Sequence, residues 1–181
     1  MSEIEFRPFR KIPRLSRGCA ITEKIDGTNA SIYISEEGEF LTGSRNRWIT
    51  PEDDNYGFST WADEHKDELL VGLGAGHHFG EWWGLGIQRA DEQTEKRFSL
   101  FNSSRWTEDN PSPDCCSVVP LLYSGVFTST AVDMCLDLLR DEGSVAAPDF
   151  MRPEGVVVYQ SAGRCYFKKT IEKDEQYKGK K

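Results

Sequence analysis

The stretch "ITEKIDGTNASIYI", residues 21–34, places a lysine, Lys24, at the end of one strand-like segment and just before a tight polar turn. Asp26 and Gly27 are typical turn residues, and a β-branched, apolar run follows Asn29. An amine at the end of a buried strand can be desolvated, and desolvation or a second cation frees its lone pair for attack. The stretch therefore predicts a covalent catalyst that faces a ligand; the simpler alternative is a surface turn with an exposed lysine.

The whole chain has the length and composition of one globular domain. Its 181 residues are 38% hydrophobic and 29% charged, and they contain no internal repeat or low-complexity segment. We expect a single domain over residues 1–181, with a basic N-terminal segment at 1–18 and a lysine-rich tail at 170–181.

Cysteine and histidine spacing favours neither a disulfide framework nor a zinc site. The five cysteines include no CxxC pair, and the three histidines do not complete a zinc-binding pattern. No leader sequence opens the chain, and no apolar run approaches the length of a membrane span. We therefore expect reduced thiols, no membrane partner and a cytoplasmic location.

The charge distribution argues against a non-specific nucleic-acid coat protein, because the net charge is −8. The charge is uneven, however, since residues 7–17 hold five cations and no acid. Such a segment can bind a polyanion locally and in a salt-sensitive way, or it can be a solvated terminus.

Hydrophobic patterns predict an α+β fold of antiparallel β-sheets flanked by helices. One helix should begin at Ser59 or Thr60 and end at Gly72 or Gly74; another should run from a cap at Ser129 or Thr130 to Gly143. The predicted strands and hairpins, with one intervening loop at 110–116, cover residues 19–25, 29–44, 77–84, 97–106 and 154–170.

The segment from Lys24 to Asn29, "KIDGTN", resembles the first motif of the covalent nucleotidyltransferases, which include ATP-dependent RNA and DNA ligases and mRNA capping enzymes. The other motifs of that superfamily follow in the same order over residues 20–170: "SRN" (44–46), "FGEWWG" (79–84), "FSLFN" (98–102), "EGVVV" (154–158) and "FKK" (167–169). Within the superfamily, "GEWWGLGIQR" (80–89) is most similar to the RNA ligase 2-type branch. The resemblance implies the nucleotidyltransferase (ATP-grasp-like) domain of these enzymes.

The resemblance also implies a reaction. Lys24 would attack ATP to form lysyl-AMP, AMP would pass to the 5′-phosphate of an RNA end, and a 3′-hydroxyl would then displace AMP and seal the strand. ATP is thus the expected AMP donor, Mg²⁺ or Mn²⁺ the expected metal, and RNA the expected partner. RNA repair by a small phage-encoded enzyme would fit the size of the chain.

Several residues would contact the nucleotide or its metal in such an enzyme. Arg45 suits a phosphate, since its guanidinium binds phosphate in a bidentate way. Glu81 would hydrogen-bond the ribose, and Glu154 would hold the divalent metal. Phe98 and Phe101 would face opposite sides of a strand, one toward the core; the resemblance favours Phe101 as the ring that stacks on adenine, with Phe98 as the alternative.

The remaining candidates lie in the first and last motifs. Asp26, Gly27 and Asn29 form the turn against the nucleotide, and Glu23 is expected to reach the adenine side through its backbone. Lys168 is the expected contact to the α-phosphate. Lys169, which points to the opposite side of a strand, is the weaker candidate for a second cation.

Two alternatives stay open at this stage. A minimal DNA ligase is favoured by Asp26, which DNA ligases and capping enzymes share, and disfavoured by "GLGIQR". A non-catalytic nucleotide- or RNA-binding module is disfavoured by the joint presence of Lys24, Glu81 and Glu154. Only about a dozen residues follow Lys169, too few to form a second domain. Three interpretations follow: a minimal ligase that binds RNA through the core and its basic ends, a chain that borrows an accessory subunit, or a domain whose adenylylated lysine serves another acceptor.

Overall fold

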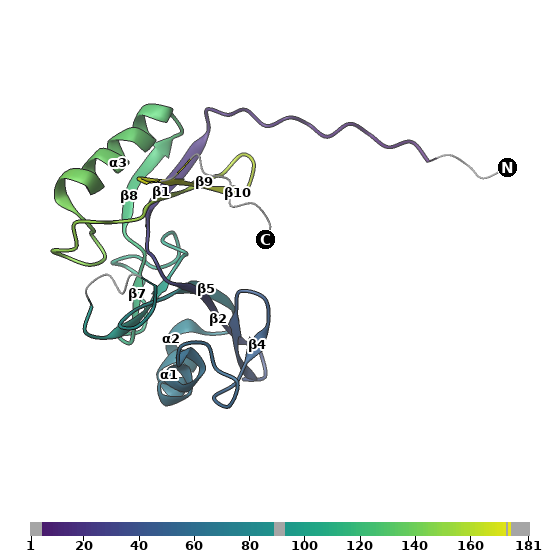
Figure 1. The fold of residues 1–181 in the computed structure, drawn as a ribbon. Coiled ribbons are helices and arrows are strands. Elements are labelled where there is room, and N and C mark those ends of the chain that lie inside the picture. Colours follow the sequence, from purple (N-terminus) through teal and green to yellow (C-terminus); the bar gives the residue numbers. More distant parts are fainter. Residues whose placement is uncertain (1–4, 89–92, 173, 175–181) are drawn as a thin grey trace, which may run out of the picture.

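The structure of the protein, a computed structural model, describes residues 5–88, 93–172 and 174. Its strands form two sheets (Figure 1). The smaller sheet has four strands in the order β10-β9-β1-β8, and the larger has six in the order β4-β3-β2-β5-β6-β7.

The small sheet is antiparallel throughout and packs against one helix, α3 (Ser129–Glu142). Ile21, Leu136 and Val158 lie in the core between them. The sheet brings together strands from both ends of the chain: β1 (Gly18–Lys24), β8 (Leu121–Val126), β9 (Gly155–Gln160) and β10 (Cys165–Thr170).

The large sheet carries two helices, α1 (Phe58–Glu64) and α2 (Lys66–Leu73), on one face. Phe58, Trp82 and Phe98 are fully buried in the core between the sheet and these helices. Its strands are β2 (Thr28–Ile34), β3 (Phe40–Ser44), β4 (Trp48–Ile49), β5 (Gly76–Gly84), β6 (Lys96–Leu100) and β7 (Cys116–Val118).

Three residues, 25–27, carry the chain from the last residue of β1 to the first of β2 and so join the two sheets. Ile25 is buried at this junction in a separate apolar cluster with Trp83 and Phe150. Gly27 packs so closely that a Cβ there would lie 2.5 Å from the carbonyl oxygen of Trp82 and 2.9 Å from Cγ of Glu81. The turn predicted around Lys24 is therefore the link between the sheets.

The predicted α+β class is confirmed, but three strands, β6, β7 and β8, differ from the prediction. β6 ends at Leu100, so the strand expected over 97–106 is shorter. β7 pairs with β6 in parallel and uses Cys116 from the predicted loop, and the patterns had not indicated β8. β7 is held by pairing with β6, and β8 by pairing with β1. Local hydrophobic periodicity does not reveal such pairings between separate segments.

The helix boundaries also need correction. The helix expected from Ser59 or Thr60 starts at Phe58, because the carboxylate of Asp54 accepts hydrogen bonds from the Ser59 and Thr60 amides at 2.8 and 3.0 Å. It is also interrupted at His65, where α1 gives way to α2.

The end of α2 at Gly74 and the end of α3 at Gly143 are confirmed. The cap of α3 is Thr128, one residue before the first predicted position; its hydroxyl accepts from the amide of Ala131 at 3.0 Å.

None of the helices in the described part of the chain is long and apolar enough to cross a membrane. All five cysteines are free thiols.

The close packing at Gly27 gives a direct test of the junction. Gly27→Ala places a methyl group against a backbone carbonyl that cannot move aside, so we expect it to lower the free energy of unfolding by about 2–3 kcal/mol. Gly18→Ala is the control, because its Cβ would meet only Ser161 Oγ at 3.4 Å and should change stability by less than about 0.5 kcal/mol. Urea unfolding measures both, and equal effects would contradict the packing described here.

Candidate active site

Lys24 and Glu154 form an ion pair at the edge of the small sheet. Lys24 Nζ donates to Glu154 Oε2 at 2.5 Å, and the two side chains are 21% and 19% exposed. Lys24 pairs in register with Gly155, so Glu154 lies one residue beyond that pair. The amide of Ile171 donates to the backbone carbonyl of Glu154 at 2.9 Å. Strands β1, β9 and β10 thus position this pair together.

Glu81 comes from the large sheet and lies close to the same pair. It stands opposite Asn29 in the β2–β5 register, and Asn29 Nδ2 donates to its Oε2 at 2.9 Å. The backbone N–H of Gly27 also donates to the Glu81 carboxylate, and the charge of Lys24 acts on it. The junction therefore brings Lys24, Asn29, Glu81 and Glu154 together from both sheets.

The electrostatics of Glu81 are unusual for a carboxylic acid. Its side chain is only 7% exposed, and this burial raises the pKa of Glu81 to about 7. The negative charge of Glu154 adds to the rise, while Lys24 and the hydrogen bonds from Asn29 and Gly27 oppose it. Near neutral pH the group is therefore poised between a hydrogen-bond donor and an acceptor.

The site has the composition of a phosphate-handling centre rather than of a preformed metal cage. No group of three or more His, Cys, Asp or Glu side chains converges anywhere in the described residues. A divalent cation would thus be held by Glu154 together with phosphate oxygens of a nucleotide. This donor set fits Mg²⁺ or Mn²⁺, which commonly bind through one or two carboxylates plus phosphates.

The two adjacent lysines of β10 face opposite ways. Lys168 pairs with Val157, which is opposite Thr22 on β1, so Lys168 lies on the same face of the small sheet as Lys24. Lys169 lies on the other face, where its Nζ donates to Asp133 of α3 at 2.9 Å. The structure brings only Lys168 to the face of the predicted nucleophile.

Phe98 is fully buried in the helix-covered core, as expected, whereas Phe101 is 38% exposed. The amide of Phe101 donates to the carbonyl of Phe79 at 2.9 Å, just beyond the end of β6. By strand alternation Phe101 lies on the side of Ser99, which pairs with Glu81. Its contact with adenine stays a prediction.

Arg45 is exposed in the bend that follows β3. β3 ends at Ser44, which pairs with Ala30, the neighbour of Asn29, so Arg45 follows the strand at the end nearer the site. Its predicted contact with phosphate is consistent with this placement and stays a prediction.

Glu23 has a role that sequence patterns did not reveal. Its side chain is 3% exposed, and its carboxylate accepts hydrogen bonds from Ser144 Oγ at 2.5 Å and from the amides of Val145 and Ala146 at 2.9 Å each. The side chain therefore anchors the loop after α3 to the strand that carries Lys24. The predicted adenine contact involves only the backbone of Glu23, whose amide donates to the Pro120 carbonyl.

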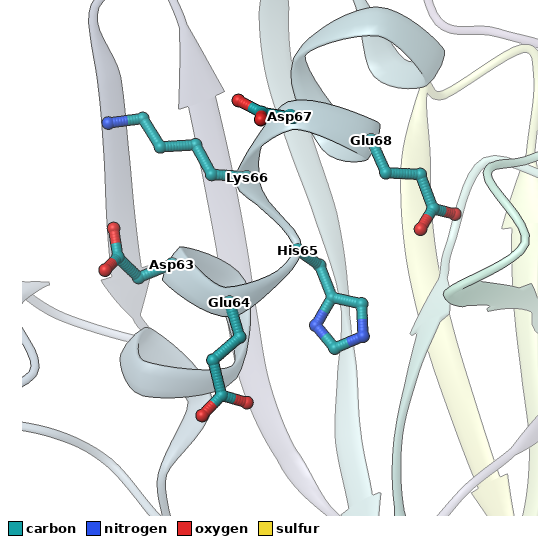
Figure 2. Close-up of a pocket in the computed structure, with 6 residues that line it drawn as sticks. All are labelled: Asp63, Glu64, His65, Lys66, Asp67 and Glu68. Atoms are coloured by element: carbon teal, nitrogen blue, oxygen red, sulfur yellow. The ribbon is translucent and has the colours of Figure 1, made fainter.

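Asp26 is half-buried in the turn between the sheets, where it also interacts with other groups of the protein. The hollow shown in Figure 2 is a different feature: it lies at the α1–α2 boundary and is lined by residues 63–68. None of the predicted site residues lines it, and it has no part in the site.

The fold and a match to a family model together identify the class: this is a nucleotidyltransferase-type domain. The chain belongs to the RNA ligase family, whose model matches residues 18–173. A comparison with curated proteins gave no match.

Solved structures of the Naegleria gruberi RNA ligase share the fold. An arginine-to-alanine variant with ATP and manganese aligns with a TM-score of 0.64 at 19% identity, over 87% of this chain and 51% of that one. A lysine-to-methionine variant with AMP and manganese gives 0.61 at 18% identity, over 86% and 50%. This chain therefore spans about half the length of those proteins.

The raised pKa of Glu81 predicts a pH-dependent stability. Between pH 4.5 and about 7 the folded state holds a proton on Glu81 that the unfolded state has lost, so the free energy of unfolding should fall as pH rises through this window. Glu81→Gln removes the titration, and wild type should lose on the order of 3 kcal/mol relative to this variant across the window. Parallel stability–pH curves for the two proteins would contradict the assignment.

Proposed function

We propose that this chain is the nucleotidyltransferase domain of an ATP-dependent RNA ligase, with Lys24 as the nucleophile. The observation that carries the proposal is the position of Lys24: at the junction of the two sheets, 2.5 Å from Glu154 and close to Glu81. Family membership and the ATP, AMP and manganese of the similar structures support ATP and a divalent metal as requirements of this chain too.

In the first step the lone pair of Lys24 Nζ attacks the α-phosphorus of ATP. A nitrogen–phosphorus bond forms, the bond to the bridging oxygen breaks, and pyrophosphate leaves with that electron pair. An ammonium has no lone pair, so Nζ must first lose a proton to solvent; its hydrogen bond to Glu154 Oε2 holds the side chain at the junction before the nucleotide and metal bind. Reaction at phosphorus otherwise depends mainly on positioning and on compensation of negative charge.

The other residues of the site supply that positioning. Lys168 lies on the face of Lys24, which supports a contact between Lys168 and the α-phosphate. Glu81 is held by Asn29 and Gly27 beside Lys24, which supports a hydrogen bond from Glu81 to a ribose hydroxyl. A divalent cation bound by Glu154 and phosphate oxygens would supply further positive charge at the reacting phosphate.

The later steps use RNA ends. The 5′-phosphate of an RNA strand attacks the phosphorus of lysyl-AMP, so that the bond to Nζ breaks and an AMP-capped end forms. A 3′-hydroxyl then attacks the capped 5′-phosphate, and AMP leaves as the strand is sealed. We propose that this activity serves RNA repair in a cytoplasm.

Labelling tests the first step directly. With ATP labelled at the α-phosphate and Mg²⁺ or Mn²⁺, wild type should acquire a covalent label that withstands denaturation and alkali and is released by acid, as expected of a nitrogen–phosphorus bond, and Lys24→Ala should abolish it. Lys66→Ala, which removes a lysine from α2 outside the site, should label like wild type. Labelling of Lys24→Ala, or none of wild type with either metal, would overturn the proposal for this chain.

The acceptor is found with the labelled protein. Nicked and single-stranded 5′-phosphorylated RNA should remove the label and yield AMP-capped or sealed products. The same assay with matched DNA ends distinguishes an RNA ligase from a minimal DNA ligase, because a DNA ligase would seal the DNA instead.

The two lysines of β10 make a matched pair of variants. Lys168→Ala should slow lysyl-AMP formation at least about ten-fold, because it removes a cation from the face of Lys24. Lys169→Ala should stay within about three-fold of wild type, since it removes only an exposed ion pair with Asp133. The rate of label formation is measured for both variants. A larger loss in Lys169→Ala than in Lys168→Ala would show that the strand register does not identify the cation that acts on the nucleotide.

A further inference from the structure

The large sheet has a second surface that the nucleotide site does not use. Side chains alternate along β5, so Trp83, Glu81, Phe79 and His77 lie on one face, away from α1 and α2. Trp83 is buried under the junction and Glu81 is in the site, but Phe79 and His77 are exposed. The face of the large sheet that carries Glu81 therefore extends beyond the site as an exposed surface at Phe79 and His77.

Four rings gather on this open part of the face: Tyr33 of β2, Trp48 of β4, and His77 and Phe79 of β5. We call them the aromatic column. Trp48 and His77 are stacked, with centroids 5.7 Å apart and planes 25° apart; His77 and Phe79 are stacked at 4.1 Å and 29°. Tyr33 meets His77 edge-on at 5.9 Å.

The two rings at the ends of the aromatic column keep about half of their surface in water: Trp48 is 51% and Phe79 54% exposed. Exposed apolar groups that cluster in this way commonly mark a binding surface, whereas single exposed rings need no explanation. The free ends of a ring stack offer flat π-surfaces, on which a further ring can be added.

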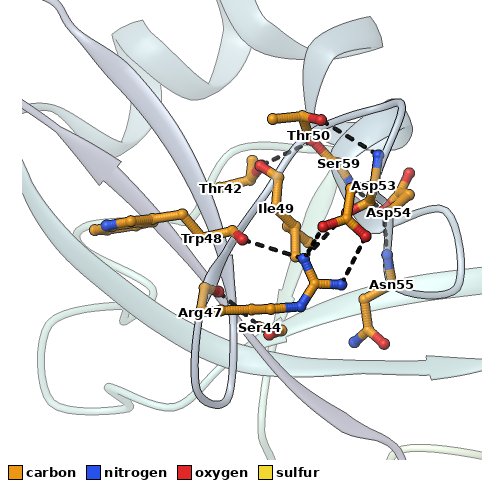
Figure 3. Close-up of polar contacts among 10 residues, drawn as sticks. All are labelled: Thr42, Ser44, Arg47, Trp48, Ile49, Thr50, Asp53, Asp54, Asn55 and Ser59. Atoms are coloured by element: carbon orange, nitrogen blue, oxygen red, sulfur yellow. Dashed lines mark hydrogen bonds and ion pairs between the residues drawn. The ribbon is translucent and has the colours of Figure 1, made fainter.

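The position of Trp48 is fixed by the backbone around it. A Cβ at Gly43 would lie 3.2 Å from Cε3 of Trp48, so the missing side chain makes room for the indole. Arg47 anchors the strand on its other side through a bidentate pair with Asp53, at 2.5 and 3.0 Å (Figure 3). In the same figure the Trp48 ring projects away from this polar network.

The charge around the aromatic column suits a polyanion whose bases are unpaired. Arg45 is exposed in the bend that follows β3, the strand that pairs with β4 and its Trp48. Burial lowers the pKa of His77, so its ring is uncharged near neutral pH and stacks as a neutral aromatic.

We propose that the aromatic column is a base-stacking site for single-stranded RNA, next to the strand end that is handled at Lys24. One base stacks on Phe79, nearest the site, and another on Trp48, while Arg45 meets the connecting backbone. The choice of RNA rests on the proposed function; the stacking site itself rests on the rings and their place on the active-site face.

RNA fits this surface better than a protein partner does. The exposed large apolar side chains on this face, Trp48, Phe79 and Phe101, are all aromatic rings, and rings stack on every base whatever the sequence. The surface is also continuous with a site built to handle nucleotides, so a strand that reaches Lys24 crosses it.

The test compares two oligomers of equal length and charge: an oligoadenylate RNA of about ten nucleotides and its abasic counterpart. Wild type should bind the first at least about five-fold more tightly, measured by fluorescence anisotropy, because only that oligomer has bases to stack. Trp48→Ala and Phe79→Ala should each weaken binding of the oligoadenylate at least about three-fold and leave the abasic oligomer unchanged, whereas Trp48→Phe should restore most of the lost affinity.

The control is Phe167→Ala, which removes another exposed ring from β10, outside the aromatic column. It should bind both oligomers like wild type. Every variant is first assayed for lysyl-AMP formation, so that damage to the fold or to the Lys24 site is recognised separately.

Equal binding of the two oligomers by wild type would overturn the stacking site, as would an equal loss of both in Trp48→Ala. A dimer in sedimentation that Trp48→Ala dissociates would assign the surface to a second copy instead. If wild type forms no lysyl-AMP but still prefers the oligoadenylate, the ligase proposal fails while the stacking site stands.

Discussion

The structure depends on one short crossing between two sheets. Residues 25–27 leave the small sheet and enter the large one, and Gly27 can occupy this turn only because it has no Cβ to meet the Trp82 carbonyl. The amide of Gly27 donates to Glu81, so the turn that joins the sheets also holds a carboxylate of the site. Because Lys24 immediately precedes the crossing, the fold places the amine where both sheets contribute neighbours.

The burial of Glu81 at this junction lowers the stability of the fold, and the proposed binding of a nucleotide would account for it. A carboxyl group as buried as Glu81 disfavours its own charge, and two hydrogen-bond donors offset the cost only in part, so its pKa remains near 7. Replacing it with an apolar side chain would remove that cost but leave the Asn29 amide and the Gly27 N–H without their acceptor. The burial is reasonable if a bound ribose completes the set of partners.

Much of this site could be predicted because it is local in sequence. The turn after Lys24, the strand that carries Glu81 and the opposite facing of Lys168 and Lys169 all follow from turn chemistry and the two-residue period of a strand. The division into two sheets could not be predicted, because β1 pairs with β8 and β9, which lie more than 90 residues away in the sequence. The anchoring of the 144–147 loop by Glu23 has the same cause: its partners are about 120 residues distant and no spacing rule connects them.

The same topology accounts for the exposed rings. Both helices of the large sheet cover one face, and the small sheet meets the other face only at the junction, where Ile25 and Trp83 are buried together. No helix or strand of the described residues covers the rest of that second face. Its side chains nevertheless point to the same side of the sheet as Glu81, because side chains alternate along β5. Apolar rings in such a place reduce solubility and contribute little to the core, so their presence is best explained by a ligand that arrives with the substrate. We propose that, for an RNA strand led to Lys24 across this face, stacking holds the bases while the 5′-phosphate reaches the lysyl-AMP.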